Sequence, residues 1–314
     1  MTQSPPPEVA YTLVPRTTRR KGSCLSPFVL AVLIIFFSCG CVVLAGVWLV
    51  QAAGGRTNVL ILGLDRRPEQ GYAVRSDTMM LLTAHPKAPH LALLSIPRDL
   101  YVEIPGYGQS RINTAHVWGE QGNPGRGPDL AMQTVVHNFG VSVRHYVRVD
   151  FEGFRAVVDA VGGIDVTVEE PILDNAYPTA DYGTMRIEIP AGPQHMDGER
   201  ALQYVRSRHG ASDFERAARQ QQVMIALSRE LLTPRNWLRL PAVSRAVLEN
   251  VETNLGPVEM VQVSVTVLRV GADGMEHRLI DRELTQPWTT PTGGAVLLPR
   301  WEAINPLVEE LFRE

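Results

Sequence analysis

The sequence predicts an α/β fold, a sheet covered on both faces by helices, behind one N-terminal transmembrane helix. From residue 57 onward, apolar runs of strand length alternate with segments of helical periodicity, as in α/β domains. Before them, residues 28–50 are almost continuously apolar and carry no charge. The apolar fraction of 45% is that of an ordinary globular protein, which excludes wholesale disorder.

Residues 28–50 are predicted to cross the membrane as a helix. At about 1.5 Å per residue the stretch is about 35 Å long, and a bilayer core is about 30 Å thick. A cleaved leader has a shorter apolar core of about 7–15 residues, so we favour a retained single-pass anchor. A basic cluster at 16–21 precedes it. The positive-inside rule then places the Pro-rich, disordered tail 1–27 in the cytoplasm and the main domain outside the cell membrane.

The first part of the outer domain is predicted to be rich in strands. After a linker at 51–56, buried strands are expected at 57–65, 78–86 and 90–99, with a turn at 86–89. Residues 101–128 hold many Gly and Pro residues and predict a long surface loop, which inside a compact domain is usually functional.

Helices and strands alternate through the rest of the chain. Helices are expected at 129–138, 151–163, 197–206, 212–232, 235–250 and 298–314. Strands are expected at 144–150 and 163–171, an irregular segment at 172–193, and a strand pair within 258–284. Ser212 and Glu215 have the spacing of a capping box. We divide the outer domain into a core, 57–232, and a C-terminal extension, 233–314, that packs on it.

Charge, cysteine content and missing motifs exclude several functions. Residues 1–27 carry a charge of +3 within a total of −3, so the remainder carries −6, which argues against nucleic-acid binding. All three cysteines precede residue 45, so the main domain has no disulfide scaffold, thiolate zinc site or cysteine nucleophile. The sequence contains no P-loop, no G-x-S-x-G elbow and no H-E-x-x-H motif.

Two aspartates stand where a ligand is expected to bind. Asp65 ends the first strand, and Asp77 follows an excursion that returns directly into the next strand. Ligands of open α/β sheets bind where strand ends and loops converge. Two carboxylates there suit Mg²⁺, which takes one or two carboxylates plus phosphate oxygens. On spacing alone, two aspartates that merely cap turns are an open alternative.

Arginines supply the candidate anion site. Guanidinium groups bind phosphate oxygens with two parallel hydrogen bonds and keep their charge. Arg216, Arg219 and Gln220 have the spacing of one helix face. The other candidates are Arg75, Arg98, Arg111, Arg206 and Arg208. Solvated surface arginines paired with acidic residues are the open alternative for each.

The order of motifs resembles the LytR-CpsA-Psr family of cell-wall glycopolymer transferases. The matching segments cover about residues 57–232 and occur in family order. They are NVLILGLD (58–65), RSDTMML (75–81), LLSIPRDLYVEIPG (93–106), RIN (111–113), VDFEGFRAVVDAVGGIDVTV (149–168) and MDGERALQYVRSRHGASDFERAARQQ (196–221).

The resemblance implies roles for individual residues. Asp65 and Asp77 would bind Mg²⁺. The pyrophosphate-binding set would be Arg75, Arg98, Arg111, Arg206, Arg208, Arg216 and Gln220, with Arg75, Arg98 and Asp77 in catalysis. Asp213 lies in a D-x-x-R stretch of the family type. The implied fold is a central mixed sheet flanked by helices, with an apolar tunnel for a polyprenyl chain.

The implied activity is a phosphotransfer during cell-wall assembly. The donor would be a glycan on a polyprenyl-pyrophosphate carrier, and the acceptor would be a sugar hydroxyl of peptidoglycan. Asp77, Asp99 and Asp213 are equally open as general base. Two other functions stay open: a phosphatase acting on the same lipid, and a non-catalytic protein that binds the lipid head group. A transcription regulator is not expected, because the cytoplasmic part is too short for a helix-turn-helix.

Overall fold

A computed structural model describes residues 54–66, 71–179, 183–207 and 213–312. The predicted tail (1–27), the predicted transmembrane helix (28–50) and part of the linker lie outside these residues. Within the described segments, no helix combines the length and the apolar character needed to span a bilayer.

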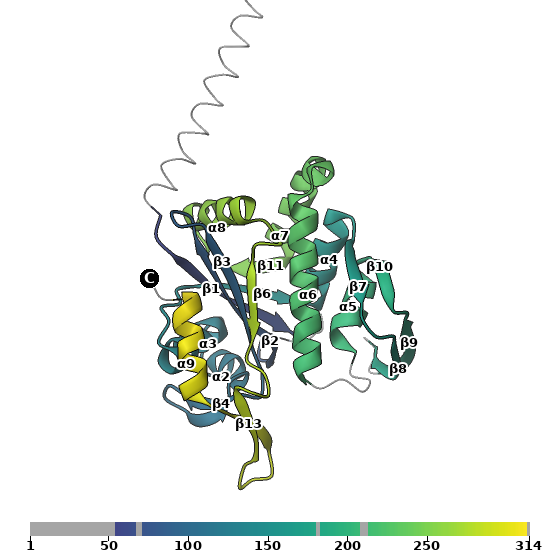
Figure 1. Ribbon diagram of the computed structural model, residues 1–314. Helices are drawn as coiled ribbons and strands as arrows, with labels where there is room; N and C mark the ends of the chain where they lie inside the picture. The colour runs from purple at the N-terminus through teal and green to yellow at the C-terminus, as the bar shows by residue number, and fades with distance from the viewer. Residues whose placement is uncertain (1–53, 67–70, 180–182, 208–212, 313–314) are drawn as a thin grey trace, which may run out of the picture. The chain divides into compact units, whose positions relative to one another are not determined.

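The central feature is a six-stranded mixed sheet (Figure 1). Its strands, from edge to edge, are β11 (Val251–Thr253), β6 (His145–Asp150), β1 (Thr57–Leu64), β2 (Ser76–His85), β3 (His90–Ile96) and β12 (Glu276–Leu279). β1 pairs parallel with β6 and antiparallel with β2, and β3 pairs parallel with β12. The predicted α/β class and the mixed sheet are therefore confirmed.

Helices cover one face of this sheet and bury its main core. They are α2 (Thr114–Gly122), α3 (Gly127–Phe139) and α9 (Trp301–Phe312). Leu60 and Leu94 of the sheet lie in one buried cluster with Val135 of α3 and Ile304 of α9. Alternate residues of the strands point to opposite faces, so Ile61 packs into a different cluster on the other face. Both faces of the sheet are thus buried, as the apolar runs predict.

The opposite face is covered by a helix where the sequence predicts strands. Residues 257–270 form α8 (Pro257–Val270), which begins after Gly256 and ends at Gly271, whose φ is 76°. Valines at every second position favour a strand, but Val263, Val267 and Val270 also share one helical face and pack against β2 and β3. The predicted strand at 258–270 is wrong, because this segment packs on the sheet as a helix and Pro257 is well placed to start it. The second predicted strand forms as β12, but it pairs with β3.

A second buried cluster lies beside the sheet. It is built from α4 (Phe151–Val161), α5 (Gly198–Arg206), α6 (Asp213–Leu232), α7 (Leu240–Asn250), β7 (Ile164–Val168) and β10 (Gly192–Met196). The Asp150 and Asp197 side chains accept hydrogen bonds from backbone amides and cap α4 and α5. Gly162, with a φ of 95°, ends α4 as predicted. A 3-10 turn, η1 (Pro234–Arg239), joins α6 to α7.

Two segments predicted to be irregular are ordered. Residues 101–128 contain a hairpin of β4 (Tyr101–Ile104) and β5 (Gly108–Arg111), followed by α2. Residues 172–193 contain the pair β8 (Ile172–Pro178) and β9 (Thr184–Ile189). Gly106 and Gly108 have φ values of 84° and 82°, so these glycines form a hairpin turn instead of an open loop. A second hairpin, β13 (Thr285–Thr289) and β14 (Ala295–Pro299), precedes α9.

Candidate functional site

A cavity of about 410 Å³ lies between the sheet and the second cluster of helices. Its wall comes from β1, β2 and the end of β6 on one side and from α4, α5 and α6 on the other. Five residues singled out from the sequence line it: Asp65, Asp77, Arg206, Arg216 and Gln220. Its apolar wall is made of Ile61, Met80, Phe151, Phe154, Leu202, Val205, Val223 and Met224. The cavity therefore has charged and apolar portions.

Strand pairing brings the two aspartates together. β1 and β2 are antiparallel neighbours, with Gly63 opposite Thr78 and Leu64 opposite Ser76. Asp65 directly follows β1 and Asp77 is the second residue of β2, so both lie at the same end of the same strand pair. A Cβ atom on Gly63 would lie 2.9 Å from the Thr78 Cβ, so glycine permits this close approach of the strands.

Arg98 connects the aspartate pair to a chain of charges. Its Nη1 donates to Asp77 Oδ1 at 2.8 Å, and its Nε lies 3.5 Å from Asp99 Oδ2. Arg111 Nε lies 3.2 Å from Asp99 Oδ1. Arg98 thus contacts a cavity residue, whereas Arg111 lies one step further from the cavity, behind Asp99.

Arg206 closes the other side of the aspartate pair. It is the last residue of α5, and its Nη2 lies 3.6 Å from Asp65 Oδ2. Its guanidinium carbon lies 4.1 Å from the centre of the Phe151 ring, and its Nη1 donates to the Tyr177 hydroxyl at 3.3 Å. Burial raises the pKa of Tyr177 although Arg206 opposes the shift, so Tyr177 stays a neutral partner. Tyr177 lies in the segment predicted to be irregular and was not predicted as a site residue.

Only part of the predicted polar face of α6 lines the cavity. Arg216 and Gln220, one turn apart, line it. Arg219 shares their predicted face, but its Nη1 donates to the Tyr204 carbonyl and its Nη2 to the Ser207 carbonyl, both at 2.9 Å. Arg219 therefore ties α6 to the end of α5, and it holds Arg206 and Arg216 on facing helices.

Some predicted residues are not brought into the cavity. Arg75 is exposed, precedes β2 and does not line the cavity. Arg111 is also outside the lining, and its Nη2 donates to the Ala295 carbonyl at 2.7 Å. Arg208 and the side chain of Asp213 lie outside the described residues.

Known proteins are similar to this chain in sequence and in fold. The model of the LytR_cpsA_psr family matches residues 47–294. The chain belongs to the LytR-CpsA-Psr family.

Individual relatives match part of the chain in sequence, and solved structures match its fold. The chain is 38% identical over 200 residues to the polyisoprenyl-teichoic acid–peptidoglycan teichoic acid transferase TagU of Oceanobacillus iheyensis, an overlap of 63% of this chain and 58% of the relative. It thus spans less than two thirds of that relative's length. The structure of B. subtilis TagV superposes with a TM-score of 0.67 at 27% identity, covering 82% of this chain and 97% of TagV. A structure of TagT bound to LIIa-WTA superposes with a TM-score of 0.65 at 26% identity, covering 82% of this chain and 89% of TagT.

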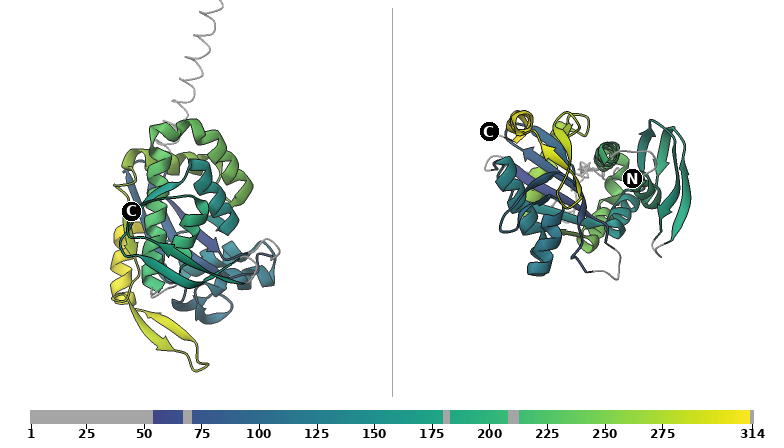
Figure 2. Two further views of the ribbon diagram at one scale, coloured as in Figure 1. Left: turned by 90° about the vertical axis from the view of Figure 1, so that its right-hand side faces the viewer. Right: turned by 90° about the horizontal axis from the view of Figure 1, so that it is seen from below.

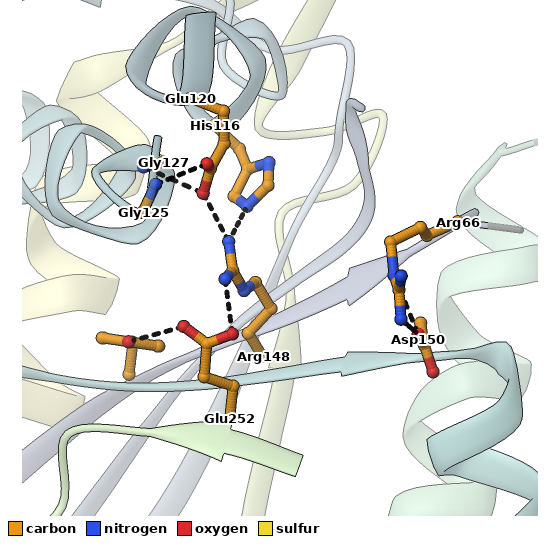
Figure 3. A network of polar contacts seen from close by, with 9 residues as sticks. Arg66, His116, Glu120, Gly125, Gly127, Arg148, Asp150 and Glu252 are labelled. Atoms are coloured by element: carbon orange, nitrogen blue, oxygen red, sulfur yellow. Dashed lines mark hydrogen bonds and ion pairs between the residues drawn. The ribbon is translucent and has the colours of Figure 1, made fainter. Parts of the chain in front are cut away.

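In this family member, a buried polar network centred on Arg148 joins β6 to α2 and β11, near the Arg66–Asp150 pair (Figure 3). Arg148 of β6, whose side chain is 2% exposed, pairs with Glu120 of α2 and with Glu252 of β11. Its guanidinium carbon lies 3.8 Å from the centre of the Tyr72 ring. His116 lies against the Val74 carbonyl at 2.8 Å, so Nδ1 is the donor and Nε2 accepts from Arg148 Nη1 at 3.2 Å.

A second set of contacts lies just after β1. Arg66 pairs with Asp150, which lines the cavity and caps α4, and the Arg66 guanidinium lies 4.5 Å from the Tyr72 ring centre. Together the two sets of contacts hold residues close in sequence to Asp65 and to Asp77. Sequence reasoning missed Arg148 and His116, because an arginine in a strand and an isolated histidine give no local signal of burial.

Two carboxylates in one cavity are a partial metal site. Among the residues that the structure describes, no three His, Cys, Asp or Glu side chains are placed together to hold a metal ion. Asp65 and Asp77 both line the cavity and would supply oxygen ligands, and Mg²⁺ in proteins takes one or two carboxylates together with water and phosphate oxygens. The donor set thus fits Mg²⁺ when a phosphorylated ligand is present.

Proposed function

We propose that the protein transfers a glycopolymer from a polyprenyl-pyrophosphate carrier to peptidoglycan during cell-wall assembly. The observation that carries this proposal is the two-part cavity, in which acidic and basic side chains meet an apolar wall. A polyprenyl pyrophosphate has the same two parts, a doubly charged head and a long apolar chain. The name of the TagU relative and the TagT complex with LIIa-WTA support the same reaction.

The charged portion of the cavity matches a diphosphate. Arg206 and Arg216 come from facing helices, Gln220 adds an amide, and Arg98 approaches from behind Asp77. Arginine forks at a site shielded from water stabilise the charge that builds up on phosphoryl oxygens. The apolar wall, from Ile61 and Met80 to Phe154 and Met224, would hold the first isoprene units.

Asp65 and Asp77 would hold a Mg²⁺ ion, which supplies charge neutralisation at the diphosphate. The Asp65 carboxylate pairs with Arg206 and the Asp77 carboxylate pairs with Arg98. These arginines would keep both carboxylates oriented and would also lie close to a bound diphosphate. An acceptor hydroxyl would attack the glycan-side phosphorus, and polyprenyl phosphate would leave. The attacking hydroxyl must lose its proton, and we favour Asp77 over Asp99 as the acceptor because Asp77 lines the cavity whereas Asp99 lies behind Arg98.

The proposed location follows from the substrate. A polyprenyl carrier lies in a membrane, so residues 28–50 would anchor the chain and the domain would work outside the cell.

The proposal is tested with the purified full chain in detergent. It is given a polyprenyl-pyrophosphate-linked glycan, Mg²⁺ and glycan strands. Transfer forms a phosphodiester on the strand and releases polyprenyl phosphate, and both need Mg²⁺. Release of phosphate products without any phosphodiester would indicate a phosphatase instead. Tight binding with no turnover would indicate a head-group binding protein.

A further inference from the structure

The β13–β14 hairpin is exposed but has no charged side chain. It projects from the described domain in both side views (Figures 1 and 2). Gln286, Pro287, Trp288 and Thr289 are all exposed. Residues 284–299 nevertheless contain no charged side chain. Exposed sheet edges normally carry charges that keep them solvated and unpaired, so an uncharged projecting hairpin with an open tryptophan indicates a contact surface.

Two aromatic rings form the centre of this surface. The Trp288 and Tyr101 ring centres lie 5.6 Å apart with an angle of 57° between the planes. Trp288 is 39% exposed, and Tyr101 is half-buried at the start of β4. Gln286, on the same face of β13 as Trp288, and nearby threonines add neutral hydrogen-bonding groups. We call Tyr101, Trp288 and Gln286 the aromatic platform.

The platform is joined to the charged end of the cavity. The Leu297 amide of β14 donates to the Asp99 carbonyl at 3.0 Å, and Arg111 Nη2 donates to the Ala295 carbonyl at 2.7 Å. Asp99 also contacts Arg98, which pairs with Asp77. Tyr101 follows Arg98 by three residues, so their Cα atoms are at most about 11 Å apart. The platform therefore lies close to Arg98, which contacts Asp77 of the cavity.

The chemistry of the platform selects its occupant. Residues 284–299 carry no charge, and Arg111, which lies opposite Tyr101 in the β4–β5 pair, forms an ion pair with Asp99, so the platform disfavours a charged ligand such as the diphosphate itself. Strand addition by a peptide is disfavoured because Pro287 removes an amide donor from β13, whose outer edge has no partner strand within the described residues. Sugar rings present apolar C–H faces that pack on aromatic rings, and hydroxyl groups that bond threonine and glutamine.

We infer that the aromatic platform binds the glycan strand of the acceptor, and presents one of its sugar hydroxyls to the diphosphate in the cavity. This inference rests on the proposed function and assigns it an acceptor subsite. Trp288 contacts the acceptor sugar, while Asp65, Asp77 and Arg206 contact the donor.

The test separates acceptor kinetics from donor kinetics in the full chain. Trp288→Ala is expected to raise the KM for glycan strands about tenfold, the loss of one stacking contact, with the donor KM changed less than twofold. Trp288→Phe keeps an aromatic ring and is expected to stay within about threefold of the wild type. Trp237→Ala is the matched control, because Trp237 is 55% exposed in η1 and lies outside the platform.

A second measurement is independent of turnover. A tetramer of β-1,4-linked N-acetylglucosamine is titrated while tryptophan fluorescence is followed, and it should bind the wild type and Trp237→Ala but not Trp288→Ala. An unchanged acceptor KM in Trp288→Ala, or equal increases in the donor and acceptor KM, would show that the platform does not bind the acceptor. If the wild type binds the tetramer but never releases polyprenyl phosphate, the proposed function fails and the sugar site stands.

Discussion

At the scale of single residues, the candidate site consists of opposite charges that already touch one another. Asp77 pairs with Arg98, and Asp65 lies near Arg206. These side chains are between 18% and 37% exposed, so the pairs contribute little to stability, typically about 0–1 kcal/mol. Under the proposed function these pairs would serve to orient the two guanidinium groups toward the diphosphate.

Arg98→Ala should therefore damage transfer and spare the fold. Removal of one preorganised charged contact commonly lowers turnover by about 10²–10³-fold. We expect that loss in the transfer assay, with a urea unfolding free energy within about 1 kcal/mol of the wild type. Arg186→Ala, which removes an exposed arginine on β9, is the control and should leave both quantities unchanged. Full activity of Arg98→Ala would refute the role of Arg98.

His116 makes stability depend on pH. Burial lowers its pKa, as does the nearby Arg148, although the Val74 carbonyl opposes the shift. Below the ordinary histidine pKa of about 6.5, the unfolded chain binds a proton that the folded chain refuses. The free energy of unfolding should therefore decrease as the pH falls from about 6.5 toward the lowered value. Glu120 stays ionised in that window because its pKa is also lowered: the Gly125 amide and Arg148 outweigh its burial.

The pH effect is measured as the difference in urea midpoint between pH 7.5 and pH 5.5. His116→Gln removes the titrating group and keeps a polar side chain, so it should reduce this difference. An equal difference in the variant and the wild type would show that other groups cause it.

At the scale of elements, the Arg148 network joins parts of the chain that are distant in sequence. Arg148 of β6 contacts Glu120 of α2 and Glu252 of β11, and it packs against Tyr72 of the loop before β2. Glu120 also accepts hydrogen bonds from the Gly125 and Gly127 amides. The network thus fixes α2, and the segment before β2 that carries Tyr72 and Val74, to the sheet.

Arg148→Met should be strongly destabilising. It leaves the Glu120 carboxylate, 4% exposed, without its charged partner, and removing one partner of a buried pair costs about 3–5 kcal/mol. Adding Glu120→Gln removes the orphaned charge and should recover part of the loss. Both are measured by urea unfolding of single and double variants. Strictly additive effects of the two substitutions would contradict direct coupling.

Elements differ in how well the sequence predicts them. The predicted bounds are close to the observed ones for β1, β2, β3, α4 and α5. Each of these strands is a compact apolar run, and each of these helices has its own capping aspartate. In residues 257–270 the apolar side chains repeat both at the two-residue spacing of a strand and at the spacing of a helix. The local pattern therefore cannot decide between the two structures. The glycines of 106–108 are turn residues in either a loop or a hairpin, so β4 and β5 depend on pairing that sequence alone does not show.

At the scale of the whole domain, the cavity exists because two buried clusters meet beside it. The sheet supplies Ile61 and Met80, and the helices supply Phe154, Val223 and Met224. About 410 Å³ is enough for the head group and part of a lipid chain, and short of a complete long polyprenyl.

Met224→Trp should discriminate donors by chain length. Met224 lies on α6 and lines the apolar wall, so a larger ring there would occupy space that the lipid needs. We expect the KM to rise at least tenfold for a long-chain donor and less than threefold for a donor with two isoprene units. Leu248→Trp, at a side chain 79% exposed on α7, is the control. An equal change for both donors would place the lipid elsewhere.

The sequence by itself determined the α/β class and the order of most elements, and it singled out the two aspartates and a set of arginines as candidates. Only the tertiary structure decided that Arg216 faces the cavity while Arg219 ties two helices, that Arg75 is exposed, and that Arg148 is buried. The physical reason is one of range. Propensity, periodicity and capping act within a few residues, whereas the direction of a long side chain depends on neighbours brought from far along the chain.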